Sequence, residues 1–114
     1  AAHVDAELER LTASAHELTE IRLLDAVRSG DLRLRAAARE EAERLASGAT
    51  AADRLGLEPD AEPPAILAAA YDALGRWQAR AENPMSDRAV QEVARALVRT
   101  CERLVAGLAE GADR

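Results

Sequence analysis

The residues best suited to chemistry in this 114-residue sequence are its two histidines, each followed by a glutamate four positions later. His3 precedes Glu7 and His16 precedes Glu20, and at this spacing two side chains on one helix can share a metal ion. The two histidines are 13 residues apart, which places the pairs about 140° apart around a helix and prevents them from meeting at one ion. No cluster of cysteine and histidine elsewhere completes a set of four ligands. We therefore predict no metal site and no cofactor, and we interpret both pairs as contacts on a helix surface.

The single cysteine, Cys101, falls within the apolar stripe of a predicted helix. A reactive thiolate needs a neighbouring base or a helix N-terminus, and the sequence around Cys101 offers neither. A free cysteine in such a stripe usually behaves as a small apolar residue, so we predict that Cys101 lies in the core. The sequence also contains no glycine-rich phosphate loop and no serine, histidine and aspartate in a recognisable catalytic motif. It therefore identifies no catalytic residue.

Four residues are candidates for binding a small ligand. Trp77 is the largest side chain, and with Tyr71 and Met85 it could line a small apolar pocket between two helices. The alternative for a lone tryptophan on an apolar helix face is a place in the core. Arg22 is the fourth candidate because it interrupts an apolar stripe, as Glu41 does in the next helix. We expect these two charges either to pair across a helical hairpin or to be solvated where their stripes end, and the sequence leaves both alternatives open.

The composition determines the fold class. Hydrophobic residues make up 48% of the chain, yet there is no phenylalanine, one tryptophan and one tyrosine. A core with so few large rings closes by bringing backbones close together, which alanine-lined helices do more readily than sheets. Alanine, leucine, glutamate and arginine dominate, and these are strong helix formers. The predicted class is all-α.

Glycine, proline and capping residues divide the chain into predicted helices over 3–29, 32–46, 65–82 and 87–108. We expect at most a short helical turn over 50–57, and an acidic, proline-rich connector over 56–64. Together these form one domain over 1–114, predicted as a four-helix, mainly antiparallel bundle with a long N-terminal helix. Ser14 opens an S-x-x-E capping box, so a break near Ser14 is the alternative to a continuous first helix.

Apolar stripes along three of these helices give the candidate core. The stripe of the second helix is Leu34, Ala38, Ala42 and Leu45, with Glu41 as its one irregularity. The inward face of the third is Ile66, Leu67, Ala70, Leu74, Trp77 and Ala81. That of the fourth is Val90, Val93, Leu97, Cys101, Leu104 and Leu108. Val98 and Val105 widen this last stripe, which is typical of a helix covered on more than one side.

The first helix is predicted to carry an assembly surface. An apolar seam with 4-3-4-3 spacing runs along its first half and comprises Val4, Leu8, Leu11, Ala15 and Leu18. From Ile21 onward the apolar residues lie on nearly the opposite side. The second helix is little more than half as long as the first, so in an antiparallel hairpin the seam extends beyond it. We therefore predict a homodimer interface at this seam.

The charge excludes several classes of partner. Net charge is −6, from 21 acidic and 15 basic residues. An acidic domain is a poor ligand for nucleic acid or for an anionic membrane, so we predict neither. No apolar run approaches a membrane span and one cysteine cannot form an internal disulfide, so we expect a cytoplasmic location. Met85 is the only methionine, so we expect either a processed chain or a domain of a longer protein.

These observations predict a non-enzymatic assembly or ligand-sensing module. The setting we expect is the effector and dimerisation domain of a bacterial transcriptional regulator, a class chosen by analogy because helical bundles serve many functions. One alternative is a small helical enzyme with a charged pocket between its helices. The other is a protein-binding scaffold without a ligand, which a filled interior and an exposed apolar surface would favour.

Overall fold

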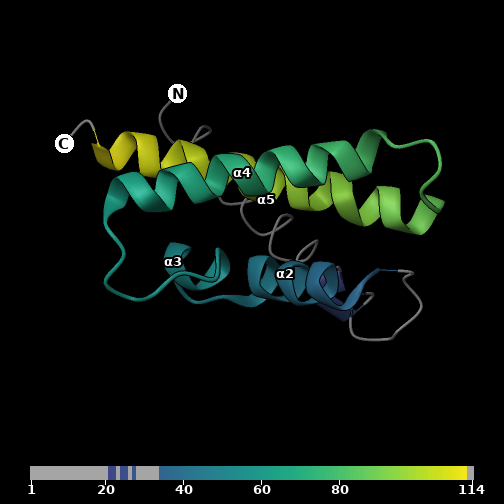
Figure 1. Ribbon diagram of the computed structural model, residues 1–114, viewed down its shortest axis with the longest axis horizontal. Helices are drawn as coiled ribbons and strands as arrows, with labels where there is room; N and C mark the ends of the chain where they lie inside the picture. The colour runs from purple at the N-terminus through teal and green to yellow at the C-terminus, as the bar shows by residue number, and fades with distance from the viewer. Residues whose placement is uncertain (1–20, 23, 26, 28–33, 113–114) are drawn as a thin grey trace, which may run out of the picture.

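The computed structural model describes residues 21, 22, 24, 25, 27 and 34–112. Every regular element in that part of the chain is an α-helix, which confirms the predicted all-α class (Figure 1). The elements are α2 (Ala36–Ser47), α3 (Ala51–Arg54), α4 (Pro63–Glu82) and α5 (Arg88–Ala112). None of the described helices combines the length and apolarity needed to cross a bilayer.

The predicted first helix is described only near its end. Ile21, Arg22, Leu24, Asp25 and Val27 are helical, and Val27 is completely buried. The remainder of this helix, with its alternative break near the fourteenth residue, lies outside the described residues. The long N-terminal helix and the four-helix bundle that includes it therefore stay predictions.

α2 begins at Ala36 and not at 32, because Arg35 has an extended backbone with φ −64° and ψ 153°. The helix thus starts where the run of alanines starts, and alanine has the highest helix propensity. It ends at Gly48, whose N–H donates to the carbonyl oxygen of Arg44 at 2.8 Å. The predicted end at 46 is one residue short of the observed one.

α3 is the short helical turn expected after α2. The hydroxyl of Thr50 accepts a hydrogen bond from the N–H of Asp53 at 3.1 Å, which caps the turn. Gly56 follows with φ +72°, a conformation that L side chains rarely adopt. Arg54 then joins α3 to α2, since its guanidinium donates to the carbonyl oxygens of Leu45 and Gly48, both at 3.0 Å. These bonds satisfy carbonyl groups that the end of α2 leaves open.

α4 and α5 form an antiparallel helical hairpin and lie side by side in Figure 1. α4 starts at Pro63, so both prolines occupy its first turn, where a missing N–H costs nothing. The turn after α4 is fixed by Asn83, whose side-chain oxygen accepts from the N–H of Met85 at 3.0 Å. Its carbonyl oxygen accepts from the side chain of Gln91 at 2.8 Å, which joins the turn to α5.

The core lies between α2 and one face of this hairpin (Figure 1). The structure confirms burial for half of the predicted stripe residues, namely Ala38, Ala42, Leu45, Ala70, Trp77, Val90, Val93, Leu97 and Cys101. Sequence reasoning missed Ala73, Ala94 and Thr100, which are also buried. The hydroxyl of Thr100 donates to the carbonyl oxygen of Ala96 at 3.3 Å, so this polar group is satisfied within α5.

Several stripe residues are only half-buried, and these lie along α4 and α5. Their members are Ile66, Leu67, Leu74, Ala81, Leu104 and Leu108, together with Val98 and Val105. Partial exposure on both helices means that α2 covers one face of the hairpin and leaves apolar surface accessible on another.

The burial of Trp77 predicts a large difference between the two aromatic residues of α4. Trp77 is 0% exposed and Tyr71 is 55% exposed. Trp77→Ala should lower the free energy of unfolding by about 3–5 kcal/mol, because it leaves a cavity in the core. Tyr71→Ala should lower it by no more than about 1 kcal/mol. Urea unfolding followed by circular dichroism measures both, and equal losses would contradict the burial of Trp77.

Candidate functional site

The structure does not bring the four predicted ligand-binding residues together. Trp77 is enclosed in the core, whereas Tyr71 is 55% exposed on α4 and Met85 is 88% exposed in the turn before α5. Arg22 is exposed. A ligand role for these residues stays a prediction. In the described part of the chain, however, the four do not share an apolar lining around Trp77.

Other predicted sites lie outside the described residues. These are both histidines and the seam of the predicted dimer interface, Val4, Leu8, Leu11, Ala15 and Leu18. Among the described residues, no three histidine, cysteine, aspartate or glutamate side chains stand close enough to hold a metal ion.

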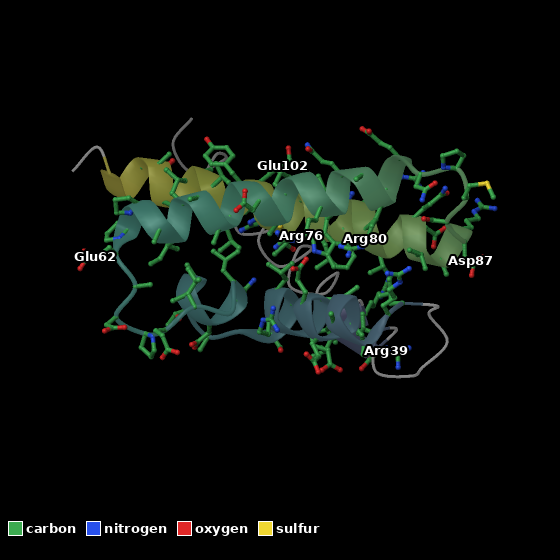
Figure 2. All side chains as sticks on the ribbon, viewed as in Figure 1. Arg39, Glu62, Arg76, Arg80, Asp87 and Glu102 are labelled. Atoms are coloured by element: carbon green, nitrogen blue, oxygen red, sulfur yellow. The ribbon has the colours of Figure 1, made fainter. Side chains whose placement is uncertain are left out.

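Glu41 is the centre of an ion-pair cluster between α2 and α4. The guanidinium of Arg76 donates to Oε2 of Glu41 from Nη2 at 2.9 Å and from Nε at 3.1 Å. Nη1 of Arg80 lies 3.8 Å from Oε1. Figure 2 labels Arg76 and Arg80 on the side of α4 that faces α2. We call these three residues the Glu41 cluster.

The Glu41 cluster corrects the predicted alternatives for Glu41. The carboxylate neither pairs with Arg22 nor is solvated, since its side chain is only 15% exposed and its partners come from α4. Arg76 and Arg80 are four residues apart, so they project from the same face of α4. Sequence reasoning placed Glu41 opposite the first helix, and it had no signal for the register between α2 and α4.

Arg80 extends the Glu41 cluster into the core. Its guanidinium carbon lies 4.3 Å from the centroid of the Trp77 ring, a cation–π distance. The indole Nε1 of Trp77 is buried and has no hydrogen-bond partner among the described residues, a cost that the surrounding packing must offset. The ring of Trp77 therefore makes its stabilising contacts, and its N–H contributes no hydrogen bond.

The charges of the Glu41 cluster affect the pKa of the Cys101 thiol. Burial raises the pKa of the Cys101 thiol from 9.0 to about 11, and the negative charge of Glu41 adds to this effect while Arg76 opposes it. The thiol is therefore protonated near neutral pH and is a weak nucleophile. Because Cys101 is also 0% exposed, the prediction that it lies in the core is confirmed.

The Glu41 cluster is therefore a structural joint. The oxygens of Glu41 accept from guanidinium groups, and the neighbouring thiol is protonated and enclosed. This arrangement offers no nucleophile to a substrate, and the described ion-pair partners of Glu41 are Arg76 and Arg80 and not Arg22. Its physical role is to fix α2 against α4.

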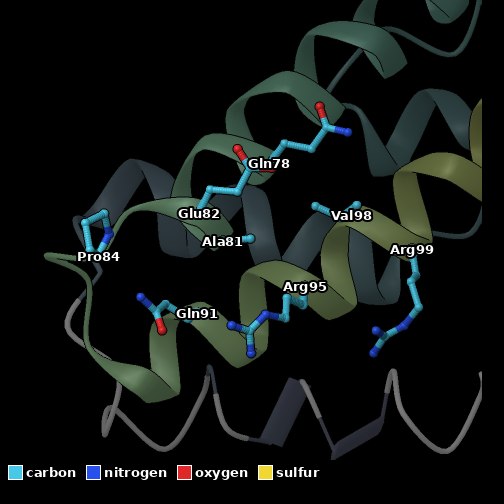
Figure 3. Close-up of a pocket in the computed structure, with 8 residues that line it drawn as sticks. All are labelled: Gln78, Ala81, Glu82, Pro84, Gln91, Arg95, Val98 and Arg99. Carbon is cyan, nitrogen blue, oxygen red and sulfur yellow. The ribbon is translucent and has the colours of Figure 1, made fainter.

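A groove of about 690 Å³ lies between α4 and α5 (Figure 3). α4 contributes Gln78, Ala81 and Glu82, α5 contributes Gln91, Arg95, Val98 and Arg99, and Pro84 closes one end. Ala81 and Val98 are half-buried and pack against the core, so they form an apolar floor between polar rims. We call this the α4–α5 groove. In the sequence, the residue that indicates this groove is Val98, because it widens the apolar stripe of α5 beyond the width that one partner helix covers.

The rim of the α4–α5 groove is basic on the α5 side. Arg95 and Arg99 are both exposed, and neither has an ion-pair partner among the described residues. Glu82 gives the α4 side one negative charge. The groove therefore combines an apolar floor with positive charge that no described residue neutralises, a combination suited to an amphipathic, acidic partner.

Comparisons with known proteins show a similarity to a mycobacterial protein. The chain is 35% identical over 109 residues to the isoniazid-induced protein IniC of Mycobacterium tuberculosis, in both strain CDC 1551 / Oshkosh and strain ATCC 25618 / H37Rv. The match covers 91% of this chain and 21% of IniC. The chain therefore spans about a fifth of the length of the curated relatives it matches. No family model matches the chain, and no solved structure does.

The Glu41 cluster predicts a difference between two glutamates with arginine partners. Glu41→Gln should lower the free energy of unfolding by about 1–3 kcal/mol, because it leaves partly buried guanidinium groups without a carboxylate. Glu92→Gln is the matched control, since Glu92 is 63% exposed and pairs with an Arg88 side chain that is 91% exposed. That control should change stability by roughly 0.5 kcal/mol or less. Equal effects in urea unfolding would show that Glu41 does not hold α2.

The raised pKa of Cys101 predicts a pH dependence. The folded thiol binds its proton more tightly than the unfolded one, so its contribution to stability is complete below about pH 9 and is lost as the pH rises toward about 11. The free energy of unfolding of the wild type and of Cys101→Ala should be measured across this pH range. The difference between the two chains isolates the contribution of the thiol from that of the other titrating groups. The wild type should lose more stability than the variant; parallel losses would refute the assignment. A thiol reagent at neutral pH should react with the folded protein far more slowly than with the unfolded chain.

Proposed function

We propose that this chain is a non-enzymatic helical assembly module that acts as a homodimer. The observation that carries the proposal is the α4–α5 groove, which has an apolar floor and two arginines without an ion-pair partner in the described part of the chain. Surfaces that combine accessible apolar area with complementary charge are typical of protein–protein contacts.

The packing of the core favours assembly over ligand sensing. Trp77, Leu45 and Leu97 are all 0% exposed and fill the centre of the space between α2 and the hairpin. A pocket of about 490 Å³ remains beside Ala38, Arg80 and Val90. A small-molecule site needs a cavity with a few convergent polar groups. In the Glu41 cluster, Arg76 binds the carboxylate at 2.9 Å, whereas Nη1 of Arg80 lies 3.8 Å from it and makes no hydrogen bond.

The second surface in this proposal is the predicted seam Val4, Leu8, Leu11, Ala15 and Leu18. Its heptad-like spacing is that of a helix that packs against other helices. The similarity to a fifth of IniC supports the view that this stretch serves as one module of a longer protein. A place in a bacterial transcriptional regulator stays a prediction by analogy, because no comparison bears on it.

Sedimentation equilibrium of the full chain from micromolar to near-millimolar concentration tests the proposal. The mass should rise with concentration from 12.2 kDa toward twice that value. Leu8→Asp and Leu11→Asp together should weaken the dimer by at least about a hundredfold, since each places a charge in an apolar contact.

Ala13→Asp is the matched control. Helical spacing places Ala13 on the side away from the seam, so this variant should dimerise like the wild type. A wild-type chain that stays at 12.2 kDa throughout the concentration range would overturn the proposed function.

A further inference from the structure

We propose that a pocket at one end of the core binds the phosphate group of a small phosphate ester. The pocket has a volume of about 490 Å³ and is lined by Arg80 of α4, by the start of α2, by the turn after α4 and by the start of α5. We call it the Arg80 pocket. It adds a ligand site to the proposed assembly module and does not depend on the dimer, because none of its lining residues lines the α4–α5 groove.

Arg80 supplies the first positive charge of the pocket. Its Nη1 is buried without a hydrogen-bond partner and lies 3.8 Å from Oε1 of Glu41, which is too far for a hydrogen bond. The carboxylate of Glu41 is bound instead by Arg76, which donates to Oε2 at 2.9 and 3.1 Å. The ring of Trp77 lies against the Arg80 guanidinium, 4.3 Å from its carbon. With a side chain that is 32% exposed, Arg80 is thus oriented by its neighbours and retains N–H groups that can donate to an anion.

The first turn of α2 supplies a second charge and free N–H groups. Arg35 precedes this helix, is exposed, and has no ion-pair partner in the described part of the chain. The N–H of Arg39 donates to the carbonyl oxygen of Arg35, so the N–H groups of residues 36–38 have no partner within the helix. The side chain of Arg35 makes no capping hydrogen bond, and the first turn contains no acidic residue. Unpaired N–H groups and the helix dipole both favour a phosphate at such an end.

α5 begins at the same end of the molecule as α2 and runs in the same direction (Figure 1). Ser86, just before α5, and Val90, in its first turn, both line the pocket, so the positive end of a second helix dipole lies beside it. α4 ends here with the opposite dipole. Its effect is reduced because Arg80 lies in the last turn of α4 and the carbonyl oxygen of Asn83 accepts from the side chain of Gln91.

The lining of the Arg80 pocket is free of carboxylates. The chain has 21 acidic and 15 basic residues, yet two of the eight lining residues are arginine and none is acidic, so the pocket favours anions over cations. Its apolar wall consists of Leu34, Ala37, Ala38 and Val90. A volume of about 490 Å³ falls in the range of small-molecule sites, roughly 300–1,000 Å³, and leaves room for an organic group beside the phosphate.

A phosphate matches these donors better than a carboxylate does. It carries up to two negative charges and three terminal oxygens, which suit two guanidinium groups together with helix N–H groups. The organic group of the ester would then contact the apolar wall. The ligand we infer is therefore a small phosphate monoester with an apolar body.

Isothermal titration calorimetry of the full chain with phenyl phosphate tests the proposal. Phenyl phosphate should bind saturably, and inorganic phosphate should bind about tenfold more weakly because it lacks the ring. Phenol, which has the ring without the phosphate, should show no binding. Phenol or inorganic phosphate binding as tightly as phenyl phosphate would overturn the assignment of the ligand.

Substitutions of arginine locate the site. Arg35→Gln and Arg80→Gln should each weaken phenyl phosphate binding by about tenfold, since each removes a charge-assisted hydrogen bond. Arg103→Gln is the matched control, because Arg103 is exposed on α5 and does not line the pocket, and it should change affinity by no more than about twofold. Arg80→Gln also removes the contact with Trp77, so circular dichroism checks its fold. Arg35→Gln leaves the core contacts intact.

Nuclear magnetic resonance shows which N–H groups meet the ligand. On titration with phenyl phosphate, the amide signals of residues 36–38 should shift more than those of residues 91–99 along the α4–α5 groove. Absence of binding, equal effects of Arg35→Gln and Arg103→Gln, or shifts confined to 91–99 would overturn the inference. A chain that binds phenyl phosphate but stays at 12.2 kDa in sedimentation keeps this inference and overturns the proposed function. A dimer that does not bind it does the reverse.

Discussion

The interaction on which the described structure depends is the joint between α2 and α4. Arg76 of α4 forms an ion pair with Glu41 of α2. Arg80 lies near the same carboxylate and over the face of the Trp77 ring. This joint links α2 to α4, and the alanines of α2 pack in the same core as residues of the hairpin. α2 packs on one face of the hairpin, and the α4–α5 groove lies outside that contact. The accessible surface is thus a consequence of where the core closes.

The joint also explains why a short, aromatic-poor chain can form a defined core. The core contains one large ring, and most of its other members are alanine, valine and leucine. Such a core gains little from any one side chain, so the position of its helices must be specified by polar contacts as well as by packing. The guanidinium groups of Arg76 and Arg80 supply that specificity, as Arg54 does where it ties α3 to the end of α2.

Sequence patterns predicted the helices better than the contacts between them. Helical periodicity indicated the buried faces of α2, α4 and α5, and glycine, proline and capping residues placed the helices within a few residues of their observed bounds, because these signals are local. The partners of Glu41 could not be predicted, since they depend on the rotation of α4 relative to α2, which no local signal encodes. The groove was anticipated only indirectly, through the extra width that Val98 and Val105 give to the stripe of α5.

The central claim is that assembly covers the α4–α5 groove and leaves the α2 joint unchanged. Hydrogen–deuterium exchange of the full chain over a dilution series measures this segment by segment. The account predicts that peptides from 1–20, 78–82 and 91–99 gain protection as concentration rises, while the peptide over 36–47 exchanges at the same rate throughout. Concentration-dependent protection confined to 36–47, or exchange at 78–82 and 91–99 that does not change with concentration, would contradict it.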